Sequence, residues 1–242
     1  MMKLYKNNEY IQDKDIMFAV ASNTISITIL FLPRYITENT VSSDGWITII
    51  LGGLIATLLG WMLAKIAVSF PNESFLSFAT YLVSKPIAIL LSFLFILQFI
   101  VISSFQMREI ANLSHEYLFD RTPLEVVCLA FILVVIYAVS GSRTAIFRLN
   151  VLFFPFVIFG LTLLIIAPIG AVKLENILPV FETDLSGILA GTTSSLNAFL
   201  GFSIVLFYIS LIKKPVQATK MTVLGIVWPF TFYIIIFILC VG

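Results

Sequence analysis

The residues of this chain that could do chemistry are the polar ones that interrupt its first apolar segment. Residues 16–36 are long and apolar enough to cross a bilayer, but Asn23, Thr24, Ser26 and Thr28 fall near the middle of the segment. A chain in hydrocarbon normally satisfies its backbone N–H and C=O groups within an unbroken helix, and irregular backbone is tolerated only where it is buried in protein or lines a cavity. The interruption therefore predicts backbone groups that open toward a solute inside the membrane.

A second interruption lies in the apolar segment at residues 185–212. Its first half is rich in small and hydroxyl residues, which are followed by Phe199-Leu200-Gly201-Phe202-Ser203, and the segment is longer than the roughly 20 residues that a straight crossing needs. We predict that this helix is also broken, so that the two breaks share one site. The alternative is that the small residues serve close helix packing, with hydroxyls bonded to the preceding turn.

Two broken helices offer a zwitterionic ligand partners without any charged side chain. N–H groups at the N-terminal end of a half-helix bind a carboxylate, and free carbonyls at a C-terminal end bind an ammonium group. The middle third of every apolar segment lacks Asp, Glu, Lys and Arg, which disfavours proton transport through an intramembrane carboxylate. We expect no catalytic residues, no metal site and no cofactor, because Cys128 and Cys240 lie in apolar segments and His115 stands alone.

Composition identifies an integral membrane protein, and the lack of period-2 alternation in its apolar segments predicts an all-α fold. Hydrophobic residues make up 60% of the chain and charged residues 11%, against roughly 25% charged in a typical soluble domain, and the mean hydropathy is +1.08. We expect the lipid bilayer to surround the chain and expect no nucleic acid partner. The polar residues 1–15 are not followed by a small-residue cleavage site, so we expect the first helix to remain in the mature protein.

Hydropathy predicts seven transmembrane helices in a single transmembrane domain that spans residues 1–242. About 20 apolar residues, each rising 1.5 Å, match a hydrocarbon core of about 30 Å. The predicted helices are residues 16–36, 46–69, 87–107, 123–140, 149–168, 185–212 and 222–241.

Lysine and arginine positions predict the orientation. With residues 1–15 in the cytoplasm, ten of the 14 basic residues fall on the cytoplasmic side, as the positive-inside rule requires. Arg34, at the outer end of the first helix, is expected to snorkel or to pair with Glu38. Residues 237–242 are still apolar, so we expect that the chain is incomplete at its C-terminus or needs a partner.

Six short motifs occur in order along the chain. They are Leu30-Phe31-Leu32-Pro33-Arg34, Asp44-Gly45-Trp46-Ile47, Gly52-Gly53, Phe70-Pro71, Leu178-Pro179 and Phe199-Leu200-Gly201-Phe202. In this order and spacing they resemble the B subunit of bacterial spore germinant receptors, a family of the amino acid, polyamine and organocation transporter superfamily. The resemblance implies a LeuT-like inverted-repeat transporter fold, of which this chain would hold the first five-helix repeat and two helices of the second, with helices 1 and 6 broken.

The resemblance also implies a function. By this resemblance the chain is a multi-pass membrane subunit of a germinant receptor in the spore inner membrane. The subunit would work with A and C subunits, bind a small nutrient such as an amino acid and trigger spore germination. The implied ligand contacts are Asn23, Thr24, Ile25, Ser26, Ile27, Phe99, Val101, Ile102, Ser103, Phe199, Leu200, Gly201, Phe202 and Ser203. Two alternatives remain open, namely an amino acid permease or symporter of the same superfamily and a truncated, inactive remnant.

Overall fold

The structure is a computed structural model. It describes residues 10–242 apart from residues 27, 42, 72, 119–120, 171, 174–179 and 213–214. Its contacts divide the chain into two compact units, one formed by Met1–Asn72 with Phe147–Gly242 and the other by Glu73–Ile146. Among the described residues every element is helical, apart from an isolated β-bridge between Ile11 and Ile212, which confirms the prediction of an all-α protein.

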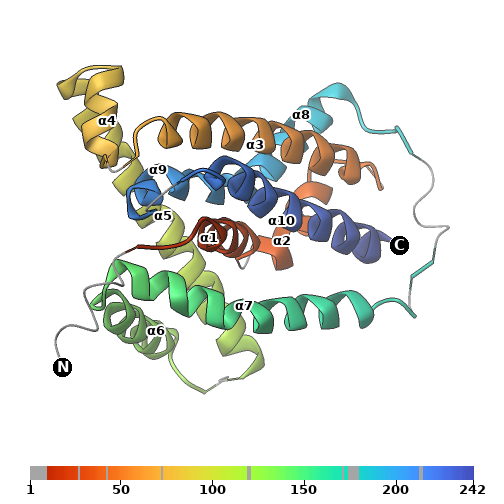
Figure 1. Ribbon diagram of the computed structural model, residues 1–242. Coiled ribbons are helices and arrows are strands. Elements are labelled where there is room, and N and C mark those ends of the chain that lie inside the picture. The colour runs from red at the N-terminus through yellow and green to blue at the C-terminus, as the bar shows by residue number, and fades with distance from the viewer. Residues whose placement is uncertain are drawn as a thin grey trace. The chain divides into compact units, whose positions relative to one another are not determined.

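The helices of each unit are shown in Figure 1. The first unit holds α1 (Asp13–Ile25), α2 (Thr28–Thr37), α3 (Gly45–Val68), most of α7 (Arg143–Ile166), α8 (Leu185–Ala198), the 3-10 helix η2 (Leu200–Ile204), α9 (Val205–Tyr208), the 3-10 helix η3 (Ile209–Leu211) and α10 (Ala218–Val241). The second unit holds α4 (Phe75–Leu82), α5 (Lys85–Tyr117) and α6 (Leu124–Val139).

The described helices give four to six candidate membrane spans. Helices α3, α5, α7 and α10 are each long and apolar enough to cross a bilayer, and two bent pairs, α1 with α2 and α8 with the segment Leu200–Leu211, pass the same test together. The chain is therefore a multi-pass membrane protein. The remaining predicted helix, residues 123–140, corresponds to α6, whose 16 residues (Leu124–Val139) span only about 24 Å. The seven-span, inverted-repeat arrangement accordingly stays a prediction.

Hydropathy placed some helix ends wrongly. Helix α5 continues to Tyr117, beyond the predicted end at residue 107, because its polar last turns contain good helix formers such as Arg108 and Ala111. The short helix α4 was not predicted at all. Its N-cap is Ser74, whose side-chain oxygen accepts the backbone N–H of Ser77 at 3.3 Å.

One face of α3 consists of small residues, and this lets neighbouring helices approach closely. Gly52, Ala56, Gly60 and Ala64 follow one another at every fourth position and all are buried. A Cβ atom added to Gly52 would lie 2.7 Å from Cβ of Ser195 on α8, a distance that real Cβ contacts do not reach. Close packing of this kind is a major source of helix association in membranes, where lipid is as apolar as the side chains.

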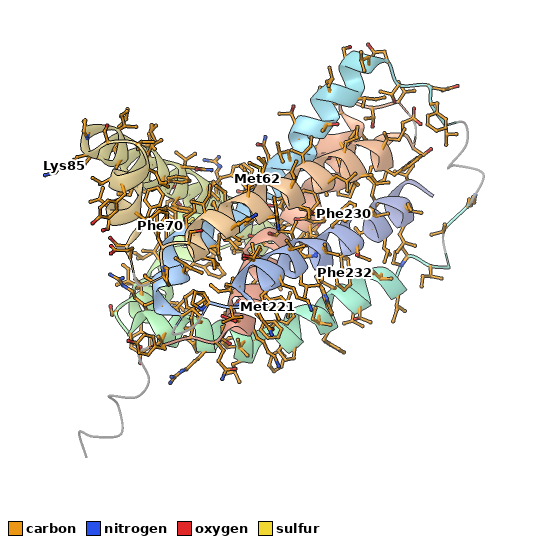
Figure 2. All side chains as sticks on the ribbon, turned by 45° about the horizontal axis from the view of Figure 1, so that its top comes forward. Met62, Phe70, Lys85, Met221, Phe230 and Phe232 are labelled. Carbon is orange, nitrogen blue, oxygen red and sulfur yellow. The ribbon has the colours of Figure 1, made fainter. Side chains whose placement is uncertain are left out.

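Helix α10 packs against both α1 and α3, and α3 and α10 run side by side in Figure 1. A Cβ atom on Gly225 of α10 would lie 2.8 Å from the carbonyl oxygen of Met17 and 2.9 Å from Cβ of Val20, both on α1. Toward α3, the ring of Phe230, labelled in Figure 2, covers Gly53. Because of this close packing, a movement of α1 would also displace α10.

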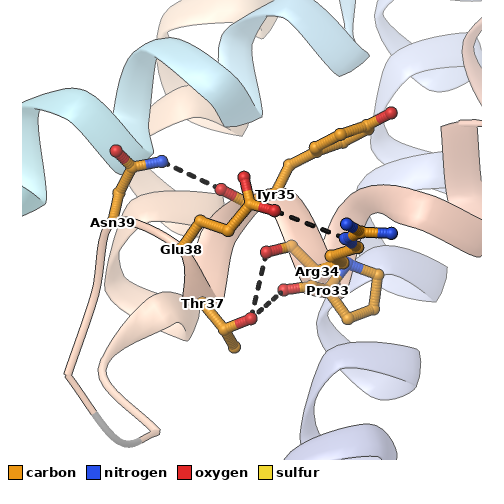
Figure 3. A network of polar contacts seen from close by, with 6 residues as sticks. All are labelled: Pro33, Arg34, Tyr35, Thr37, Glu38 and Asn39. Atoms are coloured by element: carbon orange, nitrogen blue, oxygen red, sulfur yellow. Dashed lines mark hydrogen bonds and ion pairs between the residues drawn. The ribbon is translucent and has the colours of Figure 1, made fainter.

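At the C-terminal end of α2, polar side chains form hydrogen bonds and an ion pair with nearby groups of the same segment, as Figure 3 shows. The Thr37 hydroxyl donates to the carbonyl oxygens of Pro33 and Arg34, each at 3.0 Å. The Arg34 guanidinium meets the Glu38 carboxylate at 3.3 Å, which confirms the predicted pairing. This pair is exposed, so its contribution to stability is small.

Candidate functional site

The first predicted break lies at Ser26. Helix α1 ends at Ile25, Ser26 follows with φ of 28° and ψ of −162°, and the α2 axis is turned by 49° from that of α1. A non-glycine residue with positive φ is disfavoured, by on the order of 1–3 kcal/mol, and such strain is found mainly at functional positions. The predicted contact Ile27 lies outside the described residues.

The second break lies at Phe199, where α8 gives way to the 3-10 helix η2 with a bend of 41°. The hydroxyl of Ser203 donates to the carbonyl oxygen of Leu200 at 3.1 Å, three residues back, as the tighter helix requires. A stretch of 3-10 helix inside a longer helix often marks a hinge.

The two breaks touch one another in the first unit. A Cβ atom on Gly201 would lie 2.7 Å from both the backbone nitrogen and the hydroxyl of Thr24, and 2.9 Å from the carbonyl carbon of Asn23. The Asn23 side-chain amide donates to the Gly201 carbonyl oxygen at 3.2 Å. The structure therefore brings Gly201 of one predicted helix against Asn23 and Thr24 of another, and Gly201 permits this approach because it has no side chain.

Thr24 has an unused hydroxyl at this contact. Its side chain is fully buried, and its Oγ1 atom has no hydrogen-bond partner in the structure; the same is true of the buried Oγ atom of Ser22. Most buried polar atoms are hydrogen-bonded, because an unpartnered one costs about 1–3 kcal/mol in lost hydration. A hydroxyl that stays unpartnered beside a helix break is available to a ligand.

Tyr233 of α10 completes the contact, and sequence reasoning missed it. Its hydroxyl donates to the carbonyl oxygen of Thr24 at 2.6 Å, and its side chain is 1% exposed. Its ring lies 5.1 Å from that of Phe199, which in turn lies 6.1 Å from Phe230. The sequence signal that could have identified it is that Tyr233 is the single tyrosine of a largely apolar helix.

The other predicted residues of the first unit line the same region. Ile25, Phe199 and Phe202 are all buried, Leu200 is half-buried, and Gly201 and Ser203 are buried within η2. Phe199 thus belongs to a cluster of rings with Tyr233, which favours an apolar wall over contact with lipid.

The third-helix residues lie in the second unit. Phe99, Val101, Ile102 and Ser103 all belong to α5, where Phe99 stacks on Phe95 with ring centroids 6.3 Å apart. Their predicted contact with a ligand between the two breaks stays a prediction.

A buried hydroxyl pair, also missed from the sequence, joins α3 and α8. The Thr48 and Ser195 side-chain oxygens are 3.3 Å apart, and Thr48 also donates to the Gly45 carbonyl oxygen at 2.7 Å. Both residues are fully buried. The pair fixes α8 on α3 just before the second break.

A buried carboxylate ties the connection between α2 and α3 to the residues before α8. Asp44 accepts the backbone N–H groups of Phe181 at 2.6 Å and Thr183 at 2.8 Å. Burial alone raises the pKa of Asp44, but the hydrogen bonds from Thr183 and Phe181 outweigh it and hold the pKa below the ordinary value of 3.8. The Thr183 hydroxyl adds a bond by accepting the N–H of Val41 at 2.9 Å.

The opposite end of α1 is tied to the segment between η3 and α10. The Ile11 backbone N–H donates to the carbonyl oxygen of Leu211 at 2.9 Å, and the Gln217 backbone N–H donates to the Asp13 carboxylate, also at 2.9 Å. Each bent helix pair is therefore held at an end remote from its break.

Comparison with known proteins adds to this geometry. The family model described as "Spore germination protein" (Spore_permease) matches residues 10–242. The chain belongs to the spore germination protein family. It is similar to spore germination protein GerLB of Bacillus cereus, with 37% identity over 241 residues that cover 97% of this chain and 63% of the relative.

The chain is also similar to two proteins of Bacillus subtilis. Spore germination protein YndE is 28% identical over 88% of this chain and 59% of its own length, and spore germination protein B2 is 27% identical over 93% and 61%. The chain spans about three fifths of the length of these curated relatives. No solved structure matches it.

Proposed function

We propose that this spore germination protein is the nutrient-binding membrane subunit of a germinant receptor. In this proposal it binds a small nutrient, such as an amino acid, at the breaks of the two bent helix pairs and thereby triggers germination. The observation that supports it best is the direct contact of the breaks at Gly201 and Thr24, beside a buried hydroxyl without a partner. Family membership supports the role in germination.

The breaks carry the groups that a zwitterion needs. Carbonyl groups at the end of α1 attract a cation, and the first N–H groups of α2, which begins at Thr28, attract an anion. The Thr24 hydroxyl can donate or accept, and Phe199 and Phe202 offer apolar contact to a side chain. No charged side chain is needed at this depth of the membrane.

The contact between the breaks is closed in this structure. Because Gly201 leaves no room for even one carbon atom against Thr24, a ligand must move η2 away from α1 in order to bind between them. Binding is thereby coupled to a conformational change, since a ligand shifts the equilibrium only through contacts that it makes better in one state. That coupling is what a sensor requires.

The proposal includes the assembly and its place in the cell. The chain works with germinant receptor A and C subunits in the spore inner membrane, and its N-terminus faces the cytoplasm. The basic residues on the predicted cytoplasmic side support this orientation.

Binding and transport can be separated experimentally. The purified protein in liposomes is screened with the standard L-amino acids, and a ligand is recognised by a rise in the unfolding temperature. For a sensor we expect a saturable rise without accumulation of labelled amino acid in the liposomes. Robust uptake would instead show a permease, and the absence of any ligand would contradict the proposed function.

Gly201→Ala tests the site itself. The new Cβ atom pushes against the backbone of Thr24 and destabilises the closed contact by roughly 1–3 kcal/mol. Because the ligand binds the open state, we expect the half-saturating nutrient concentration to fall by about fivefold or more. Gly160→Ala is the matched control, since an added Cβ atom there meets nothing within 4 Å. Unchanged nutrient sensitivity in Gly201→Ala would remove this residue from the site.

A further inference from the structure

We infer that the hydroxyl of Tyr233 competes with the ammonium group of the ligand for the carbonyl oxygen of Thr24. The inference rests on the proposed function and names the ligand class, a primary amine. It assigns to α10 a part in the site that neither the sequence motifs nor the relatives' names indicate.

The geometry places the hydroxyl on the atom that a cation would seek. Thr24 lies in the last turn of α1, where carbonyl groups lack an intrahelical donor and carry the negative end of the helix dipole. The Tyr233 hydroxyl donates to this carbonyl at 2.6 Å. A phenolic O–H thus occupies the position in which an ammonium N–H would make a stronger, charge-assisted hydrogen bond.

The carbonyl is enclosed, so the two donors exclude one another. Thr24 is fully buried, Tyr233 is 1% exposed, and the rings of Phe199 and Tyr233 pack edge to face. Gly201 covers the nitrogen and hydroxyl of Thr24 from the other break. An ammonium group reaches the carbonyl only if the tyrosine hydroxyl leaves it.

The exchange would carry a signal to α10. Tyr233 shares a buried face with Gly225, which contacts the backbone of α1, and with Ile226, which contacts Gly60 of α3. Releasing the hydroxyl removes a polar link between α10 and α1 and leaves the apolar contacts in place. Ligand binding at α1 would then loosen α10, which carries no predicted ligand contact.

The test is the binding of amino acids to the purified protein in liposomes. Tyr233→Phe keeps the ring and removes the competing donor, so we expect the half-saturating concentration of the amino acid to fall roughly two- to tenfold, the range of one hydrogen bond. The analogue in which hydrogen replaces the amino group should gain nothing. Tyr208→Phe, which alters a half-buried tyrosine of α9, serves as the control. It should leave the binding of the amino acid and the binding of the analogue unchanged.

A second variant covers the case in which Tyr233→Phe does not fold. Difluorotyrosine at position 233 keeps the shape but donates more strongly, so the half-saturating concentration should rise. Unchanged or equally altered binding of the amino acid and its analogue would overturn the inference while leaving the proposed function intact. If the wild-type protein binds no amino acid at all, the proposed function fails, and this inference fails with it.

Discussion

Thr24 is the residue on which the candidate site depends, because each of its polar atoms faces something different. Its carbonyl oxygen accepts the Tyr233 hydroxyl, its backbone nitrogen lies against Gly201, and its own hydroxyl has no partner. A fully buried residue that leaves a hydrogen-bonding group unused lowers the stability of the empty protein. Such a cost is typical of a group that is held ready for a ligand.

Thr24→Val tests both whether the unpartnered hydroxyl destabilises the empty protein and whether it binds the ligand. The substitution keeps the shape and removes the unpartnered oxygen, so we expect the free energy of unfolding to rise by about 1 kcal/mol. We expect nutrient binding to weaken at the same time, because the ligand loses a partner. Thermal unfolding and ligand titration of the same sample measure both effects.

Thr48→Val is the matched control, since Thr48 is equally buried but its hydroxyl contacts Ser195. Here we expect a loss of about 1 kcal/mol, because Ser195 is left without its partner. A loss of similar size in Thr24→Val would show that the Thr24 hydroxyl supports the fold and is not reserved for a ligand.

At the scale of elements, the broken helices are anchored away from their breaks. The segment before α8 is held by Asp44, and the start of α1 is held by the strand-like pairing of Ile11 with Ile212. These anchors fix the ends, while the breaks meet through a glycine and a 3-10 turn.

The Asp44 anchor makes stability depend on pH. Since the pKa of Asp44 is lower in the folded state than its ordinary 3.8, its contribution is complete above that value and is lost as the pH falls through the folded-state pKa. Asp44→Asn should lower the free energy of unfolding by roughly 1.5–3 kcal/mol at pH 7, because two N–H groups lose a charged acceptor.

The measurement is the unfolding temperature of the wild type and of Asp44→Asn across the acid range. The difference between the two should shrink as the pH falls below 3.8. Glu38→Gln, which alters an exposed pair, should stay within about 0.5 kcal/mol of the wild type. A difference for Asp44→Asn that does not change with pH would show that the carboxylate charge is not what holds the connection.

At the scale of the whole molecule, the open question is how many times the chain crosses the bilayer. Four helices are long enough, two bent pairs bring the number to six, and α6 is short for a hydrocarbon core of about 30 Å. A short apolar helix can still cross if the bilayer thins locally. The predicted seven spans require α6 to be one of them.

Cysteine labelling tests the topology. In a protein whose Cys128 and Cys240 are replaced by alanine, single cysteines are placed at Glu38, Arg121 and Ser142, all at exposed positions. With seven spans and a cytoplasmic N-terminus, a membrane-impermeant reagent should label positions 38 and 121 from outside and position 142 only after permeabilisation. Labelling of 121 and 142 from the same side would exclude α6 as a span.

The sequence by itself determined the class, the approximate helices and the positions of both breaks. Hydropathy is a local property, and the requirement that buried backbone be hydrogen-bonded makes a polar interruption such as Asn23-Thr24 visible without any tertiary information. The motif around Gly201 likewise marked the second break. Local signals failed where helix propensity continued past the apolar stretch, as at the end of α5.

Only the tertiary structure decided which atoms meet. The bond from Tyr233 to the Thr24 carbonyl, the packing of Gly201 on Thr24 and the pair of Thr48 with Ser195 join residues between 147 and 209 positions apart. Such contacts depend on how each helix is rotated about its axis, and in an apolar helix hydropathy is nearly the same on all sides. That rotation is set by the close fit of glycines and rings, which emerges only when the helices are packed together.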